Sequence, residues 1–166
     1  NLHDRIRVRG RYRNLPVLQF TGRDTMSDVV GEKVEERHLS DILARSMGRI
    51  GMSTVFRLCA AERTTAGAYY ILYVQAKTTD DEIRVAEDLA KLREDTEKGL
   101  LENYHYRYAR EIGQLGPLEL YTISSGGPQA YVDRCLAHGM REGDIKPVLL
   151  SRKTGWIDAF PGALLP

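Results

Sequence analysis

The stretch that most restricts the fold is a nearly continuous apolar run, Ala68–Lys77, "AYYILYVQAK". A strand with one solvated face alternates between apolar and polar residues, whereas this run is apolar at successive positions. The pattern predicts a central strand with both faces covered. A second predicted strand, Val55–Glu62, precedes it across a turn at residues 63–67. Together the two strands predict the middle of a sheet that other elements cover on both sides.

Helical and strand patterns alternate around this pair and give the order α-β-β-α-α-β-α-β after an N-terminal hairpin. Helices are predicted at 35–47, from Thr79 onward, at 96–113 and at 126–139, and further strands at 118–123 and 145–150. The sequence leaves open whether the second and third helices are continuous. The tail, Lys153–Pro166, is predicted to be ordered but irregular. Helices between strands predict an α/β (α+β) fold, a small mixed β-sheet covered by helices and preceded by a β-hairpin.

The spacing of apolar residues predicts which helix faces are buried. The first helix places Leu39, Ile42, Leu43, Ser46 and Met47 at helical spacing, with Gly48 as its predicted end. In the helix from Thr79, the predicted buried side comprises Ile83, Ala86 and Ala90 beside Val85, Leu89 and Leu92. The next helix carries one stripe of Leu101, Tyr104, Tyr108 and Ile112.

The N-terminal hairpin carries an arginine at every second position from 5 to 13, with Ile6, Val8, Gly10 and Tyr12 between them. This period of two predicts a strand with the arginines on its solvated face and the other residues inward. Residues 14–16 predict the turn and 17–21 the second strand. The arginines fit a solvated or acid-paired face, a phosphate-facing surface or a nucleic-acid groove, although Tyr12 on the other face supplies no stacking platform.

Composition limits the class of protein. The chain has 166 residues, 42% hydrophobic and 28% charged, enough for one core. Its net charge of +1 argues against a general nucleic-acid-binding protein, although residues 1–23 alone carry +5. Cys59 and Cys135 are predicted to be buried free thiols. With no secretory signal or membrane-spanning run, we expect a cytoplasmic protein that does not engage membranes. The abrupt start at Asn1 suggests a fragment of a larger protein.

Few residues show a pattern typical of catalysis. The four histidines are scattered, and none has a metal-ligand spacing with Cys, Asp or Glu, so we assign no metal ligand. Phosphate-binding and dinucleotide-binding glycine motifs are missing from the sequence. Ser124–Gly127 fits either an anion cradle or a capped helix start. From composition alone, Lys146 beside Pro147 is an exposed lysine. The residues by themselves predict a mixed α/β domain with a basic hairpin, and no function.

Several motifs nevertheless resemble a known family. They are Leu2-His3-Asp4, Asn14-Leu15-Pro16, Phe20-Thr21-Gly22-Arg23 and Gly31-Glu32-Lys33, followed by "YRYAREIGQLGPLELYTISSGG" and "HGMREGDIKPVLLS". Together they resemble the C-terminal part of the acyl acid–amido synthetases, which comprise the auxin- and jasmonate-conjugating enzymes of plants and their bacterial relatives. This family lies within the adenylate-forming superfamily, and the chain is most similar to its bacterial type.

The resemblance implies two parts. Residues 1–23 would form a hairpin at the junction with a missing N-terminal large domain, and 24–166 the small, mobile C-terminal domain. Such enzymes use ATP and Mg²⁺ to convert a carboxylic acid into an acyl-adenylate and then conjugate it to an amino acid. The small domain rotates over the active site between the two steps, which positions the reactants. The parent protein would be a ligase, and the isolated chain inactive.

The resemblance also implies roles for four residues. Asp4 corresponds to the carboxylate that binds the ribose hydroxyls, Arg23 to the arginine near ribose and phosphate, and Asp24 to the hinge. Lys146 corresponds to the catalytic lysine that reaches the phosphate or carboxylate of the adenylate. Two departures from the family pattern are His3 in place of Gly and Pro147 directly after the lysine. The alternative function is a non-catalytic module that uses the basic strand to bind nucleic acid or an acidic protein.

Overall fold

A five-stranded mixed sheet forms the centre of the protein. The computed structural model describes residues 4–23, 25–65, 67–77 and 82–166, and only the backbone of 4–6, 20–23 and 82. The strand order is β8-β5-β6-β7-β9, and the strands are β5 (Thr54–Thr64), β6 (Gly67–Ala76), β7 (Glu119–Ile123), β8 (Leu150–Ser151) and β9 (Gly162–Leu164). The predicted central strand is β6, which confirms the prediction from its apolar run. It pairs antiparallel with β5 and parallel with β7.

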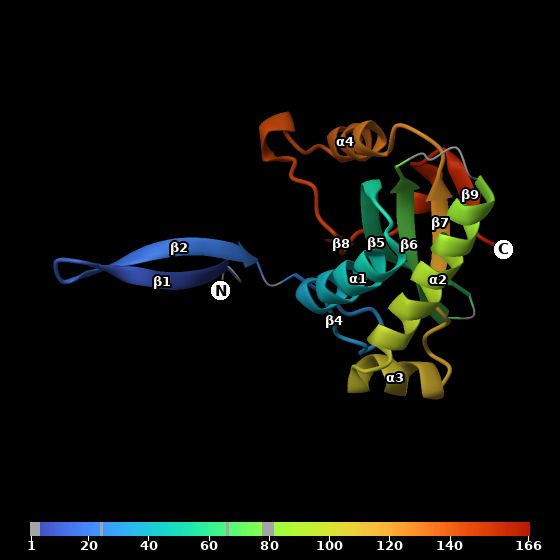
Figure 1. Ribbon diagram of the computed structural model, residues 1–166, viewed down its shortest axis with the longest axis horizontal. Coiled ribbons are helices and arrows are strands. Elements are labelled where there is room, and N and C mark those ends of the chain that lie inside the picture. The colour runs from blue at the N-terminus through green and yellow to red at the C-terminus, as the bar shows by residue number, and fades with distance from the viewer. Residues whose placement is uncertain (1–3, 24, 66, 78–81) are drawn as a thin grey trace.

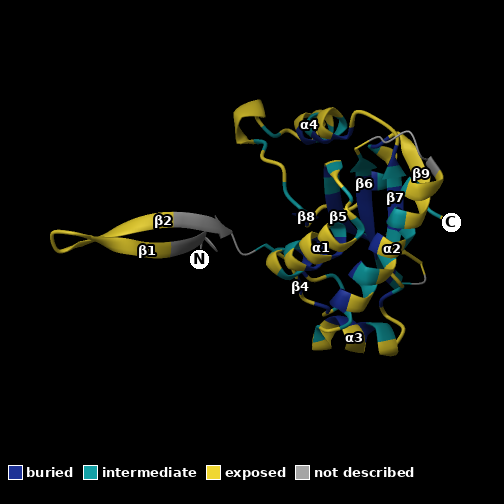
Figure 2. Cartoon of the chain, in the orientation of Figure 1, coloured by how far each residue is buried: buried dark blue, intermediate teal, exposed yellow. Residues whose placement is uncertain are grey.

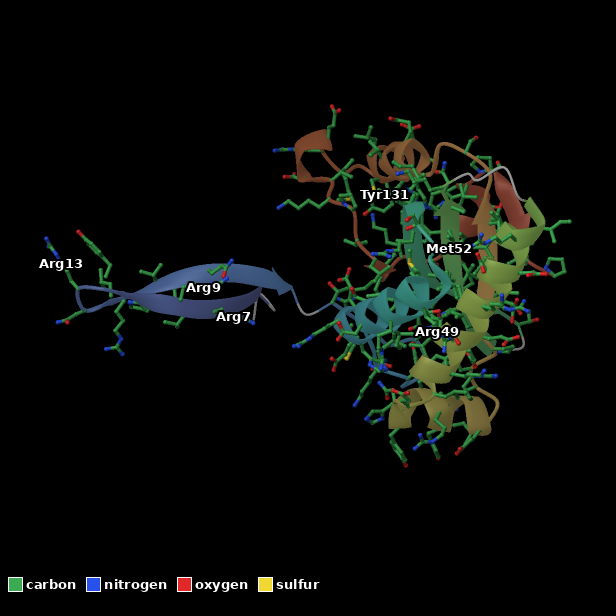
Figure 3. All side chains as sticks on the ribbon, viewed as in Figure 1. Arg7, Arg9, Arg13, Arg49, Met52 and Tyr131 are labelled. Carbon is green, nitrogen blue, oxygen red and sulfur yellow. The ribbon has the colours of Figure 1, made fainter. Side chains whose placement is uncertain are left out.

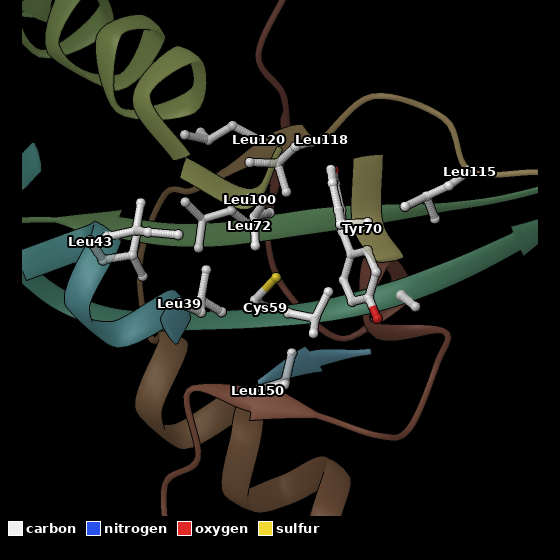
Figure 4. Packing of buried hydrophobic residues seen from close by; sticks show 14 of the residues in the cluster. Leu39, Leu43, Cys59, Tyr70, Leu72, Leu100, Leu115, Leu118, Leu120 and Leu150 are labelled. Carbon is white, nitrogen blue, oxygen red and sulfur yellow. The ribbon is translucent and has the colours of Figure 1, made fainter. Parts of the chain in front are cut away.

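Helices cover both faces of this sheet, as predicted (Figure 1). They are α1 (Glu36–Ile50), α2 (Glu82–Leu100), α3 (Tyr104–Glu111) and α4 (Gly127–Ala137), with the short 3₁₀ helices η1 (Glu142–Asp144) and η2 (Trp156–Asp158). One hydrophobic core lies between α1, α2, α3 and the sheet, where Leu39, Cys59 and Leu72 meet (Figure 4). The second lies between the opposite face of the sheet, α4 and the C-terminal tail.

Helix α1 confirms the predicted apolar face, because Leu39, Ile42, Leu43 and Ser46 are buried. Its end differs from the prediction. Gly48 lies inside the helix, which ends at Ile50 and is capped by Gly51, whose φ of 70° lies in the left-handed region. Glycine adopts this conformation without strain, so it terminates helices well.

The predicted buried side of the next helix is partly wrong. Leu89 and Leu92 are buried, but Ile83 is 77% exposed and Ala86 is exposed as well. The start predicted at Thr79 lies outside the described residues. The chain then breaks at Asn103, whose side chain accepts hydrogen bonds from the amides of His105 and Tyr106. The two helices, whose continuity the sequence leaves open, are therefore separate: α2 ends at Leu100 and α3 begins at Tyr104.

Helix α3 buries a different face from the apolar stripe identified in the sequence. Tyr104 and Tyr108 of that stripe are 63% and 51% exposed, whereas Tyr106 is fully buried. The hydroxyl of Tyr106 donates to Glu97 Oε2 (2.7 Å), and Arg110 Nε donates to Glu97 Oε1 (2.9 Å). These polar contacts to α2 fix the rotation of α3 about its axis, which apolar spacing alone does not predict.

The tail is ordered, as predicted, but it is more regular than expected. It contributes η2 and the edge strand β9, which pairs antiparallel with β7. Trp156 is 2% exposed, and its ring stacks on Tyr131 and Phe160. The carboxylate of Glu62 on β5 accepts hydrogen bonds from the amides of Gly155 (2.7 Å) and Trp156 (2.9 Å). The tail is therefore part of the second core.

Strands β1 (Asp4–Tyr12) and β2 (Leu15–Arg23) form the predicted antiparallel hairpin, which extends away from the sheet in Figure 1. A two-stranded sheet of β3 (Met26–Ser27) and β4 (Val34–Glu35) follows it. The prediction that one face of the hairpin is turned inward is wrong for the side chains that the structure describes. Val8, Tyr12, Leu15, Val17 and Leu18 are between 46% and 71% exposed (Figure 2).

Candidate functional site

Lys146 lies on an irregular segment, residues 145–150, that connects η1 to β8; we call it the Lys146 segment. We predicted a strand over this whole range, but only Leu150 at its end is in a strand. The side chain of Lys146 is exposed, as composition suggested. The backbone carbonyl of Lys146 accepts a hydrogen bond (2.9 Å) from the hydroxyl of Tyr131, a residue of α4 labelled in Figure 3. Burial raises the pKa of Tyr131 to about 12, so this hydroxyl keeps its proton at neutral pH.

The other end of the Lys146 segment is fixed by α1 and β5. Glu36 Oε1 accepts hydrogen bonds from the amides of Leu149 (2.8 Å) and Leu150 (3.4 Å). The amide of Cys59 donates to the carbonyl of Leu149. Because Pro147 lacks a backbone N–H, the hydrogen-bonded pairing of β8 with β5 cannot continue toward Lys146. The result is an exposed lysine on a backbone that three elements hold in place.

The residues predicted to contact the nucleotide lie at the base of the hairpin. Asp4 and Arg23 are direct cross-strand partners, so the structure brings these two backbone positions together. Their side chains and the proposed hinge, Asp24, lie outside the described residues. Lys146 comes from a separate part of the chain, between η1 and β8. The roles of all four residues remain predictions.

The arginines of the hairpin do not share one face. A bulge between Val8 and Gly10 shifts the register, so Arg7 pairs with Gln19 but Arg11 pairs with Pro16. Successive residues of a strand point to opposite faces, and Gln19 and Pro16, three positions apart, therefore lie on opposite sides of β2. Arg9 Nε donates to Gln19 Oε1, which places Arg9 with Arg7. The bulge thus removes the continuous basic stripe predicted from the alternation.

The glycine-containing loop before α4 is a capped helix start. The amide of Gly127 donates to Gln75 Oε1 at 2.8 Å, and Gly126 is left-handed with φ of 66°. Pro128 sits in the first turn, as predicted. Since the side chain of Gln75 on β6 already occupies the Gly127 amide, the structure favours this interpretation of Ser124–Gly127 over the anion cradle.

Sequence reasoning missed the role of Glu32, which lies in one of the motifs that carry the family resemblance. Glu32 is fully buried and accepts hydrogen bonds from the amides of Val29 and Val30 and from the hydroxyl of Tyr70. The Tyr70 oxygen also lies 2.7 Å from Ser27 Oγ. Burial and the adjacent carboxylate raise the pKa of Tyr70. Glu32 therefore ties the loop that follows the hairpin to the central strand β6.

Both cysteines are buried and unpaired, as predicted. Burial raises the pKa of the Cys59 thiol to about 12, which makes it a poor nucleophile at neutral pH. Within the described ranges, no cluster of three or more His, Cys, Asp or Glu side chains is arranged to hold a metal ion. Over the same residues, no helix is long and apolar enough to cross a membrane.

Comparison with solved structures identifies the fold first. The chain superposes on "GH3.15 acyl acid amido synthetase" with a TM-score of 0.63 and 18% identity, covering 95% of this chain and 29% of that one. It superposes on "AtGH3.15 acyl acid amido synthetase in complex with 2,4-DB" with a TM-score of 0.57 and 16% identity, covering 92% and 28%. The chain thus spans less than a third of these proteins and shares the fold of one part of them.

A family model then identifies the chain more closely. The model described as "GH3 family C-terminal domain" matches residues 39–155, which is most of the chain. The protein therefore belongs to the GH3 family and contains its C-terminal domain. A comparison with curated protein sequences found no match. The matched range includes the Lys146 segment and leaves the hairpin outside.

Proposed function

We propose that this chain is the C-terminal part of an ATP-dependent ligase that adenylates a carboxylic acid and conjugates it to an amino acid. The observation that carries the proposal is Lys146, an exposed cation on a fixed backbone within the range that matches the family model. The similar structures are themselves described as acyl acid amido synthetases. The bacterial type and the cytoplasmic location remain predictions, the latter supported by two unpaired cysteines.

Each proposed site residue has a chemical role that suits its side chain. The Lys146 ammonium would stabilise negative charge that develops on the phosphate or carboxylate during transfer. The Asp4 carboxylate offers two acceptor oxygens for a ribose diol, and the Arg23 guanidinium would face the ribose and phosphate. Because Asp4 and Arg23 are cross-strand partners, both would meet the same nucleotide. Asp24 would act as the hinge.

ATP and Mg²⁺ would bind mainly to a large N-terminal domain that precedes this chain. The described residues include one exposed lysine at the proposed site and no clustered carboxylates for a metal, so they fit an accessory part of a nucleotide site. ATP supplies the adenylyl group that activates the acid. The large domain would also cover the hairpin, whose apolar residues are exposed on both of its faces.

The alternative of a nucleic-acid or acidic-protein module depends on a continuous basic strand face. The bulge in β1 places Arg7 and Arg11 on opposite sides of the hairpin, which weakens that alternative. Binding to generic oligonucleotides that falls steeply with salt would restore it. We expect no such binding at physiological ionic strength.

ATP–pyrophosphate exchange tests the proposal. The full-length protein should show exchange that depends on a carboxylic acid, whereas the 166-residue chain alone should show none. In the full-length protein, Lys146→Ala should lower adenylation or amide formation by about 10²-fold or more, since one positioned charge commonly contributes that much. Arg152→Ala removes a nearby exposed cation and serves as the matched control. Unchanged rates in Lys146→Ala would exclude Lys146 from the site.

A further inference from the structure

A groove of about 530 Å³ lies beside the Lys146 segment, between the end of α1 and the start of β5. Its walls include Met47, Met52, Phe56, Pro147 and Val148, and they carry one charged side chain, Arg57. This volume falls within the usual range for small-molecule sites. The groove therefore combines apolar side chains with the polar side chains of Ser53 and Thr54 and a single cation.

The guanidinium of Arg57 has hydrogen-bonding capacity to spare. Arg57 is half-buried, and its Nη1 lies 3.0 Å from the sulfur of Met47. A thioether is a weak acceptor, whereas a guanidinium offers five N–H donors. Among the described residues, no carboxylate forms an ion pair with Arg57. The carboxylate of Glu36, which holds Leu149 of the groove lining, accepts hydrogen bonds from the amides of Leu149 and Leu150.

Both walls of the groove are fixed in the chain itself. The Lys146 segment is held by Tyr131 and Glu36, as described above. On the other side, the amide of Met52 donates to the carbonyl of Met47 at 3.0 Å, just beyond the left-handed Gly51 that ends α1. A ligand would therefore meet a largely preformed surface, and the flexible methionine side chains would adapt to its shape.

We propose that this groove binds a small molecule with one carboxylate and an apolar tail, the carboxylate meeting Arg57 and the tail meeting Met52, Pro147 and Val148. A guanidinium matches the planar geometry of a carboxylate with two parallel hydrogen bonds. No acidic side chain lines the groove to repel it. The lining carries a single cation, which matches the charge of one carboxylate better than that of a doubly charged anion such as phosphate. This site is separate from the proposed nucleotide contacts and does not depend on the proposed function.

Titration of the 166-residue chain with 4-methylpentanoate, followed by amide NMR shifts, tests the proposal. The neutral isostere 4-methylpentanamide and inorganic phosphate are the comparison probes. We expect saturable shifts at the groove residues with the carboxylate, affinity lower by about tenfold or more with the amide, and no saturation with phosphate. Equal affinity for acid and amide, or saturation by phosphate, would overturn the proposal, as would the lack of any saturable binding. This comparison needs no variant.

Variants locate the ligand. Arg57→Gln should weaken 4-methylpentanoate binding by about tenfold or more, and Arg57→Lys should restore part of it because the charge returns without the planar fork. Arg45→Gln, an exposed arginine on α1 away from the groove lining, should leave the affinity unchanged. Val148→Asp should also weaken binding, since it places a like charge in the wall. Retained affinity in Arg57→Gln would place the ligand elsewhere and exclude this site.

Discussion

The hairpin and the Lys146 segment differ in how regular their secondary structure is and in how many tertiary contacts hold them in place. The hairpin is paired along its length in an antiparallel ladder with two register shifts, yet its described apolar side chains are exposed on both faces. The Lys146 segment has almost no regular structure, yet Tyr131, Glu36 and Cys59 hold its backbone at both ends. A two-stranded hairpin without a buried face is marginally stable on its own. Regular secondary structure therefore does not identify the well-supported parts of this protein; burial and tertiary hydrogen bonds do.

The largest expected effect on stability is at Trp156 in the C-terminal tail, which burial and tertiary contacts hold in place. Trp156 is 2% exposed, stacks on Tyr131 and Phe160, and donates its Nε1–H toward Ser151 Oγ and the carbonyl of Lys153. Trp156→Ala should lower the free energy of unfolding by about 3–5 kcal/mol, because it opens a large cavity in the second core. Urea unfolding followed by circular dichroism measures the change.

The matched control for that measurement is Tyr12→Ala in the hairpin. Tyr12 is also a large aromatic residue, but it is 67% exposed. Its loss should change the free energy of unfolding by no more than about 0.5 kcal/mol. Similar losses for Trp156→Ala and Tyr12→Ala would contradict the proposed difference between the two regions.

A smaller effect is expected where the loop after the hairpin joins the body of the protein. Glu32→Gln keeps the size of the side chain but removes the charge that accepts hydrogen bonds from Val29, Val30 and Tyr70. We expect a loss of about 1–3 kcal/mol in the free energy of unfolding, the usual cost of leaving buried partners poorly satisfied. Glu35→Gln, at an exposed position, should be neutral. A neutral Glu32→Gln would mean that this network does not hold the loop.

The contact between α1 and α2 gives a prediction in which two effects oppose each other. A Cβ at Gly99 would lie 2.7–2.9 Å from three side-chain carbons of Ile42. Alanine gains about 1 kcal/mol of helix propensity, but overpacking costs about 1–3 kcal/mol. Gly99→Ala should therefore destabilise the protein by up to about 2 kcal/mol. Gly48→Ala in α1, where a Cβ meets nothing within 4 Å, should instead stabilise it. Thermal unfolding of the two variants should show shifts of opposite sign.

Much of the sheet and its helices could be predicted from the sequence, because their signals are local. The apolar run at residues 68–77 requires coverage on both faces, and the spacing in α1 defines one buried stripe. The tail gave no such signal. Strand β9 has three residues, and its place depends on contacts with β7 and on the hydrogen bond from the Tyr121 hydroxyl to the carbonyl of Phe160.

Prediction of the candidate site at Lys146 is limited in the same way, because it depends on contacts between distant parts of the sequence. The exposure of Lys146 follows from its neighbours in the sequence, but the groups that fix its segment do not. Tyr131 lies 15 residues before Lys146, and Glu36 lies 113 residues before Leu149. The hairpin shows a related failure, since strict alternation predicted one arginine face and the register shift between Val8 and Gly10 divided it. Gly10 beside that bulge is the one local signal that favours an interruption of the ladder.

The smallest effect in the isolated chain should come from Leu18→Lys, and this variant tests what covers the hairpin. Leu18 is 56% exposed, so a lysine there should change the free energy of unfolding of the 166-residue chain by no more than about 0.5 kcal/mol. If the proposed large domain packs on this face, the same change in the full-length protein buries a charge and should lower the transition midpoint clearly. Arg11→Lys, a conservative change, serves as the control in both. Equal and small effects in the two proteins would show that this face stays solvated, and would leave Asp4 and Arg23 as the parts of the hairpin that matter.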